Sequence, residues 1–228
     1  MSIVTPLLFA TVQPNLYRGS YPHSINFDFL KSLNLKCIIS LLPNPITEDF
    51  DYELFHFAKQ NNIQLIHFYV NVKLPNTIKD RLYTPSIQTT TTNDDLTMTD
   101  SSLILKKQKD KEKKKKVKRK LAQVPLDYTT INQIITFLCN KKNYPIYLHC
   151  TNGELICSLV VACLRKFTYW SNVSILNEFL IYNSSINIYE RSFIENFDTN
   201  PNSVIDWNKF NIQDKIDWLN KQYLKRDI

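Results

Sequence analysis

A short apolar run, a loop that carries a cysteine and a long apolar segment follow one another over residues 144–166. The run Ile146–Leu148 comes directly after Pro145 and predicts a buried strand. A strand, a loop and a helix in this order direct the loop N–H groups and the helix N-terminus at one point, which makes an anion-binding cradle. Cys150 lies in that loop, so the sequence predicts a nucleophilic thiolate with a lowered pKa there. The apolar residues beyond the loop recur at helical spacing and are Leu155, Leu159, Val160, Cys163 and Leu164.

Gly153 occupies the same loop, and the chain contains only two glycines. Glycine adopts positive φ readily and lets another backbone approach closely, because it has no Cβ. In a chain with so little glycine we expect Gly153 to meet one of these two needs.

The loop His149–Gly153 resembles the start of the protein tyrosine phosphatase signature, in which His-Cys, two residues, Gly and two residues precede Arg and then Ser or Thr. Three further segments, Asn15–Pro22, Asn26–Leu42 and Phe167–Ser171, are similar to the plant-and-fungal atypical dual-specificity phosphatases. The resemblance is greatest to the fungal oxidant-induced cell-cycle arrest group and its tyrosine-protein phosphatase members. It covers most of the chain except about residues 77–123 and the C-terminal end.

The resemblance implies a phosphocysteine nucleophile at Cys150, with no cofactor and no metal. It also implies substrates that carry phosphotyrosine, phosphoserine, phosphothreonine or an inositol pyrophosphate. Active relatives take a general acid from the stretch before the helix that precedes the catalytic strand, where Asp110 and Asp127 are the candidates, neither within a recognisable motif. The anion-binding loop would consist of His149, Thr151, Asn152, Gly153, Glu154, Leu155 and Ile156.

The loop departs from the signature at three positions. Ile156 stands where the family has the arginine that binds two phosphoryl oxygens through a planar fork and stabilises the transition state. Glu154 adds a negative charge to a loop that would hold a dianion. Cys157 replaces the Ser or Thr whose hydroxyl normally helps the thiolate to leave. The nucleophile is therefore present without its usual catalytic surroundings.

Three functions remain open at this point. The first is a catalytically impaired phosphatase fold, a pseudophosphatase scaffold. The second is a slow or unusual phosphatase that acts on phosphoprotein or inositol pyrophosphate. The third is a binding module that acts through the lysine-rich segment Lys106–Lys120. The resemblance also implies association with related family members in a hetero-complex.

The positive charge of the chain belongs to one segment. Lys106–Lys120 has a net charge of +9, so the rest of the chain carries −2 of the total of +7. One hypothesis is that this segment docks on an acidic partner through its charge. The other is that it is a solvated insertion without a binding role. The segment has no aromatic residues to stack on bases, which disfavours specific nucleic-acid recognition.

Five cysteines form no ligand-like spacing, so we expect free thiols in a reducing compartment. The sequence shows no signal peptide and no window long and apolar enough for a membrane span. Together these features predict a cytoplasmic protein. His56 and His67 have no ligand motif around them and are expected to be structural. Arg18 could lend its charge to the Cys150 loop, but the expected role is a surface or structural salt bridge.

The remaining pattern predicts an α/β fold of the protein tyrosine phosphatase type, with a central, mostly parallel sheet of four or five strands flanked by helices. We expect one domain over residues 1–228, interrupted by a disordered lysine-rich insertion at about 77–123. Asn26, Asp127 and Ser171 are expected to cap helices. The other expected strands cover 9–12, 36–42 and 63–72, with a loop at 16–20. The expected helices cover 23–33, 52–60, 128–141, 155–166, 173–182, 188–197 and 212–223, the last with Trp218 inward.

Overall fold

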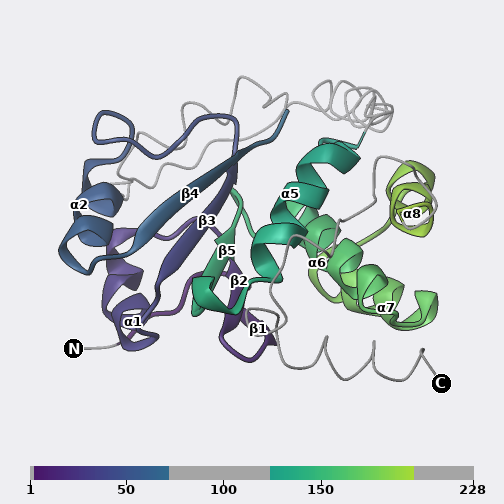
Figure 1. Ribbon diagram of the computed structural model, residues 1–228, viewed down its shortest axis with the longest axis horizontal. Helices are drawn as coiled ribbons and strands as arrows, with labels where there is room; N and C mark the ends of the chain where they lie inside the picture. Colours follow the sequence, from purple (N-terminus) through teal and green to yellow (C-terminus); the bar gives the residue numbers. More distant parts are fainter. Residues whose placement is uncertain (1–2, 72–123, 198–228) are drawn as a thin grey trace, which may run out of the picture. The chain divides into compact units, whose positions relative to one another are not determined.

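The structure, a computed structural model, describes residues 3–71 and 124–197. Five strands form one sheet in the order β1-β2-β5-β3-β4 (Figure 1). β1 pairs antiparallel with β2, and all other neighbours are parallel. The predicted α/β fold with a mostly parallel sheet is thus confirmed. The strands are β1 (Ala10–Gln13), β2 (Leu16–Gly19), β3 (Cys37–Leu42), β4 (Gln64–Tyr69) and β5 (Ile146–His149).

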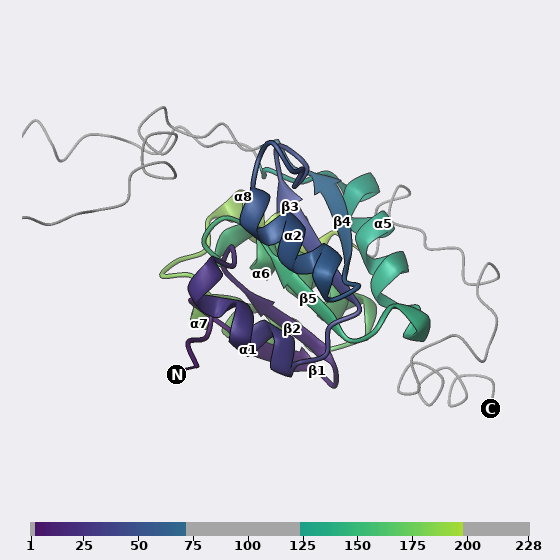
Figure 2. The ribbon, with the colours of Figure 1, turned by 90° about the vertical axis from the view of Figure 1, so that its left-hand side faces the viewer.

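Helices cover both faces of this sheet, and Figure 2 shows α1 and α2 in front of it. The helices are η1 (Ser24–Asn26), α1 (Phe27–Ser32), α2 (Tyr52–Gln60), α5 (Tyr128–Leu138), η3 (Lys141–Asn143), α6 (Leu155–Phe167), α7 (Asn172–Tyr182) and α8 (Ile188–Glu195). None of the described helices is long and apolar enough to cross a membrane. The predicted helix at 212–223, Trp218, Asp110 and the segment Lys106–Lys120 lie outside the described residues.

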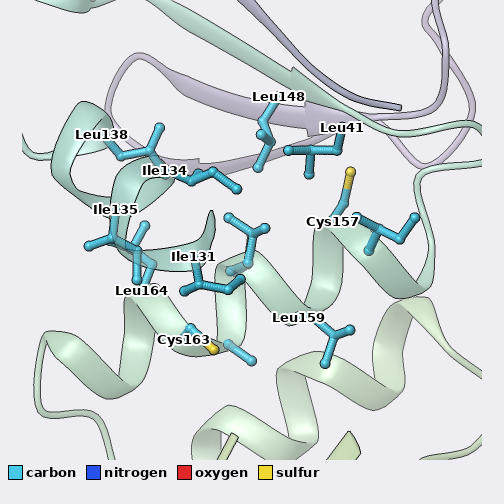
Figure 3. Packing of buried hydrophobic residues seen from close by; sticks show 14 of the residues in the cluster. Leu41, Ile131, Ile134, Ile135, Leu138, Leu148, Cys157, Leu159, Cys163 and Leu164 are labelled. Atoms are coloured by element: carbon cyan, nitrogen blue, oxygen red, sulfur yellow. The ribbon is translucent and has the colours of Figure 1, made fainter. Parts of the chain in front are cut away.

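The central strand β3 explains why its sequence is apolar throughout. Every residue of Cys37–Leu42 is buried, because both faces of the strand are covered. Ile39 and Leu41 belong to the core that α5–α8 build on one face, part of which Figure 3 shows. Ile38 and Leu42 belong to the core with α1 and α2 on the other face. Alternate residues of one strand thus serve two cores.

The prediction of a loop at 16–20 is wrong. Leu16–Gly19 form β2, which pairs in parallel with β5 from Leu16 opposite Ile146 to Gly19 opposite His149. Gly19 suggested a turn, but backbone hydrogen bonds to a strand far away in sequence decide the conformation. Local turn signals cannot reveal such a partner.

Helix ends and helix faces differ from the expectation in detail. Asp127 and Ser171 cap α5 and α7 as predicted, accepting hydrogen bonds from Thr130 N and Ser174 N. The side chain of Asn26 does not cap α1, because its oxygen accepts from His23 N instead. In α7 the core takes Ile175 and Phe179, whereas the apolar side chains of Val173 and Leu180 are 70% and 43% exposed.

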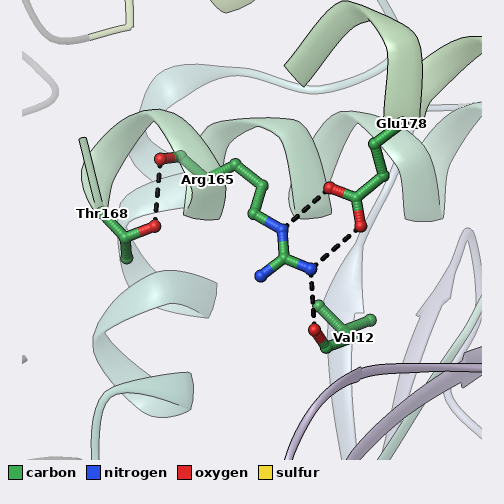
Figure 4. A network of polar contacts seen from close by, with 4 residues as sticks. All are labelled: Val12, Arg165, Thr168 and Glu178. Carbon is green, nitrogen blue, oxygen red and sulfur yellow. Dashed lines mark hydrogen bonds and ion pairs between the residues drawn. The ribbon is translucent and has the colours of Figure 1, made fainter. Parts of the chain in front are cut away.

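Arg165 ties the end of α6 to two other elements (Figure 4). Its Nε and Nη2 donate to the two carboxylate oxygens of Glu178 at 2.8 and 2.9 Å, and Nη2 also donates to Val12 O at 2.7 Å. Its guanidinium lies 4.1 Å from the ring centroid of Trp170. This bidentate pair, between buried Arg165 and half-buried Glu178, joins α6 to α7, and the hydrogen bond to Val12 O joins α6 to β1.

Candidate active site

The Cys150 loop, residues 150–154, joins the carboxyl end of β5 to the start of α6. This position lies at the middle of the sheet, where open parallel sheets bind ligands beyond the ends of their strands. Gly153 has φ +78°, which confirms the expected need for a glycine. A Cβ on Gly153 would also lie 2.8 Å from Gly19 C and from Ser20 N, so the loop packs directly on the backbone of β2.

The Cys150 thiol has an environment that favours its ionised form. Hydrogen bonding from the Cys157 thiol and from the backbone N–H groups of Cys157, Gly153 and Asn152 lowers the pKa of Cys150 to about 7, against the opposing effect of burial. The side chain is only 1% exposed. At neutral pH a large share of Cys150 is therefore thiolate.

Cys157 supplies a donor that the sequence comparison with the signature did not predict. Burial and the neighbouring Cys150 raise the pKa of Cys157 well above its usual value, so it keeps its proton. Its Sγ also lies 3.8 Å from Gly19 O, an alternative acceptor for the same S–H. A protonated thiol thus occupies the position of the signature hydroxyl, within reach of Cys150.

His149 holds the base of the loop as a neutral side chain. Complete burial lowers its pKa to about 4. Its Nδ1 contacts Cys150 O at 3.4 Å, and its Nε2 contacts Ser40 Oγ at 2.8 Å. Because a carbonyl oxygen only accepts, this pattern fits a proton on Nδ1 and a hydrogen bond from Ser40 to Nε2.

The sequence suggested that Glu154 places a negative charge inside the loop, but this charge is not buried. Glu154 is exposed, and one of its oxygens accepts a hydrogen bond from Asn152 Nδ2 at 2.7 Å. Asn152 Oδ1 accepts from Glu154 N at 3.2 Å and lies 3.8 Å from Cys150 Sγ. Solvent screens an exposed carboxylate, so its repulsion of a bound anion is weaker than expected.

The remaining residues of the predicted anion-binding loop have structural contacts, and Leu155 and Ile156 belong to α6. Ile156 is 8% exposed and belongs to the core on the α5–α8 face, and half-buried Leu155 packs against the same core. Thr151 O accepts a hydrogen bond from Tyr21 N at 3.2 Å. The position of the signature arginine is therefore filled by a buried alkyl group that has no hydrogen-bond donor on its side chain.

Arg18 is a residue of the site whose place at the Cys150 loop the sequence analysis considered but did not favour. It is 1% exposed, and Nη2 donates to Gly153 O at 2.7 Å and to Ser158 Oγ at 2.8 Å. Among the described residues no carboxylate pairs with it, so the predicted salt bridge is wrong. The only available signal was that its segment belongs to the resemblance to the phosphatases.

The candidate acids and histidines have other partners. Asp127 is exposed, and its carboxylate caps α5, while Asp110 lies outside the described residues. His67 Nε2 contacts Leu42 O at 2.8 Å, and His56 Nε2 contacts Glu48 at 3.1 Å, which fits the predicted structural roles. In 3–71 and 124–197 no group of three His, Cys, Asp or Glu residues could hold a metal ion.

Replacing Cys157 with alanine is expected to raise the pKa of Cys150, because the thiolate loses its strongest hydrogen-bond donor. Cys157→Ser is the matched control, since its hydroxyl still donates and should keep the pKa low. The thiolate absorbance in the ultraviolet, followed against pH with Cys150→Ala as the blank, measures both. Equal titration curves for the alanine and serine variants would contradict the role of the Cys157 thiol.

Known proteins resemble this chain along most of its length. A family model described as "Tyrosine phosphatase family" matches residues 3–215. The Saccharomyces cerevisiae protein "Putative tyrosine-protein phosphatase OCA6" is 46% identical over 226 residues, which cover 99% of this chain and 83% of that protein. "Inositol diphosphatase DSP2" of Arabidopsis thaliana is 27% identical over 199 residues, covering 87% of this chain and 71% of that protein.

A solved structure shares the fold. The core catalytic domain of the S. cerevisiae PP-IP phosphatase SIW14 superposes with a TM-score of 0.58 at 20% sequence identity, covering 85% of this chain and 87% of that domain. The family model and the 46% identity each span nearly the whole chain. The chain therefore belongs to the tyrosine phosphatase family.

Proposed function

We propose that this chain is a catalytically impaired phosphatase-fold protein, which offers Cys150 to phosphorylated ligands but binds them weakly and turns them over slowly or not at all. The observation that carries the proposal is Ile156, which stands at the position of the signature arginine and packs in the core. A bound phosphoryl group could still accept hydrogen bonds from the N–H groups of the loop, but it would lack the two hydrogen bonds that the guanidinium of the signature arginine donates.

The reaction needs positive charge beside the phosphoryl oxygens, and this need supports the proposal. When the Cys150 thiolate attacks phosphorus, an S–P bond forms, the bond to the leaving oxygen breaks, and that oxygen takes up a proton. Negative charge lies on the phosphoryl oxygens throughout, and loss of even one neutral donor to such oxygens costs about a hundred- to a thousandfold in rate. The missing donor here is a cation, so the lowered pKa of Cys150 alone does not restore efficient turnover.

The decisive experiment is an activity assay of the purified chain beside its Cys150→Ser variant. The substrates are phosphotyrosine, phosphoserine and phosphothreonine peptides and an inositol pyrophosphate. We expect no turnover, or very slow turnover, that depends on Cys150. Rapid release of phosphate that disappears in Cys150→Ser would overturn the proposal.

A slow inositol pyrophosphate phosphatase is the second candidate. The observation that favours it is the Cys157 thiol donor beside a Cys150 with a pKa of about 7. The names of the Arabidopsis inositol diphosphatase and of the yeast PP-IP phosphatase point to the substrate class. Slow turnover of the inositol pyrophosphate alone, lost in Cys150→Ser, would select this function over the impaired scaffold.

Restoring the arginine is expected to strengthen anion binding. In Ile156→Arg combined with Glu154→Gln, a guanidinium can donate to two oxygens of an oxyanion, so affinity for vanadate should rise by about tenfold or more. The thermal stability should fall, because position 156 is buried and a charge there loses hydration. Titration of vanadate against protein fluorescence measures the affinity, with Ile156→Met and Glu154→Gln as the uncharged control. A folded arginine variant that binds vanadate no better than this control would count against the proposed cause of impairment.

We propose that Lys106–Lys120 docks on an acidic partner, and that related family members are partners in a hetero-complex. The charge of +9 within one short segment supports the first proposal. Deletion of residues 85–120 should leave the melting temperature nearly unchanged and abolish salt-sensitive binding to an acidic protein or polyphosphate. A deletion variant that fails to fold would show that this segment is structural.

A further inference from the structure

A buried arginine reaches the Cys150 loop from a strand 135 residues earlier in the sequence. Arg18 lies in β2, and Nη2 makes its two short hydrogen bonds to Gly153 O and Ser158 Oγ, with a longer one to Glu154 O at 3.4 Å. The guanidinium also lies 3.8 Å from the ring centroid of Tyr182. Arg18 thus joins β2, the loop and the first turn of α6.

The hydrogen bond to Gly153 O fixes more than one oxygen atom. A trans peptide is planar, and its C=O and N–H point in opposite directions. Anchoring Gly153 O therefore sets the direction of the Glu154 N–H, which donates to Asn152 Oδ1. It also restricts ψ of Gly153, the residue whose own N–H donates to Cys150. Because glycine has wide backbone freedom, a contact from outside the loop is needed to select one conformation.

The neighbours of Arg18 in sequence form the rest of this support. Gly19 and Ser20 lie directly against Gly153, and Gly19 O lies near Cys157 Sγ. Tyr21 N donates to Thr151 O at 3.2 Å. The backbone of residues 18–21 thus packs against the Cys150 loop and donates a hydrogen bond to it.

The charge of Arg18 points to the same role. A buried guanidinium is costly unless an anion or several acceptors stabilise it. None of the described carboxylates pairs with Arg18, and its Nε has no hydrogen-bond partner among the described residues. The positive charge of Arg18 lowers the pKa of the neighbouring Cys157 thiol, against the larger effect of burial, which raises it.

We propose that Arg18 is a positioning residue of the Cys150 loop. From β2 its guanidinium anchors Gly153 O and the Ser158 hydroxyl, and it thereby holds the loop N–H groups on the sulfur of Cys150. The loop and the first turn of α6, residues 150–158, contain no arginine that could share this task. The inference rests on Cys150 as the nucleophile of the proposed function, but not on any rate of turnover.

Arg165 provides a matched control for the alternative that Arg18 only stabilises the fold. Both arginines are buried, both donate to a backbone carbonyl of another element, and both guanidiniums lie over an aromatic ring. Arg165 lies ten residues beyond Leu155 in α6, which is about 15 Å along the helix. A purely structural role would make the two arginines equivalent in their effect on Cys150.

The test is the ultraviolet titration of the Cys150 thiolate in Arg18→Met, Arg18→Lys, Arg165→Met and Arg165→Lys, each checked for folding by circular dichroism. Arg18→Met should raise the midpoint by about one pH unit, since the thiolate loses donors that the anchored loop keeps aligned. Arg18→Lys keeps the charge, but its ammonium does not reproduce the position of Nη2 between Gly153 O and Ser158 Oγ, so an intermediate shift is expected. Cys157 and His149 titrate outside this range, and Arg18 and Glu154 are the charged side chains at the loop.

The Arg165 variants should leave the midpoint unchanged even where they lower the melting temperature. An unchanged midpoint in the Arg18 variants, or an equal shift in the Arg165 variants, would overturn the proposal. If Arg18→Met does not fold, Arg18→Lys against Arg165→Lys decides the question. Because the titration needs no substrate, rapid turnover by the unaltered chain would refute the impaired function without affecting this result.

Discussion

Gly153→Ala is expected to destabilise the fold by about 3 kcal/mol or more, through positive φ and a steric clash together. Alanine at φ +78° carries a strain of the order of 1 kcal/mol. The new Cβ would also lie 2.8 Å from Gly19 C and Ser20 N at the end of β2, and these atoms cannot move without disturbing the pairing of β2 with β5. Urea denaturation measures the free energy of unfolding, and the thiolate titration should show a raised pKa of Cys150 at the same time.

Gly153→Asn separates the two causes. Asparagine tolerates positive φ better than alanine does, but it brings the same Cβ. If the clash dominates, asparagine will be as destabilising as alanine, and if strain dominates it will recover much of the loss. An alanine variant with nearly unaltered stability would contradict the close packing of the loop on β2.

Arg165→Met is expected to lower the free energy of unfolding by about 3 kcal/mol, because it leaves the partly buried carboxylate of Glu178 and the carbonyl of Val12 without their donor. Replacing both partners, in Arg165→Met with Glu178→Met, should recover a large part of that loss, since no charge is then left unpaired. The four unfolding free energies of this double-mutant cycle measure the coupling. Additive effects would mean that the bidentate pair contributes no stability of its own.

The sequence predicted the centre of the site well because its signals are local. The apolar run of β5, the periodicity of α6 and Gly153 all lie within residues 144–166. The strand, the helix and the need for a glycine that they predicted were each confirmed. The position of Ile156 in the core follows from the same helical periodicity. Such features depend on near neighbours in sequence, which a pattern records.

The sequence did not predict the parts of the site that depend on distant partners. Arg18 sits between a tyrosine and a glycine in a strand whose sequence predicts a loop, and its acceptors lie 135 or more residues away. The exposure of Glu154 and the hydrogen bond from Cys157 depend on the direction of side chains after the loop has folded. The sequence also did not determine which face of α7 is buried, because apolar residues occur around much of that helix.

The dependence of the Cys150 loop on β2 has a consequence for the order in which the molecule assembles. Contacts between segments so far apart in sequence form late, because closing a long loop costs entropy before any contact rewards it. Any local unfolding that detaches the N-terminal hairpin β1–β2 would also release the loop, even with β5 and α6 intact. In native-state hydrogen exchange, the amides of the Cys150 loop should therefore open together with those of β2 as one cooperative unit.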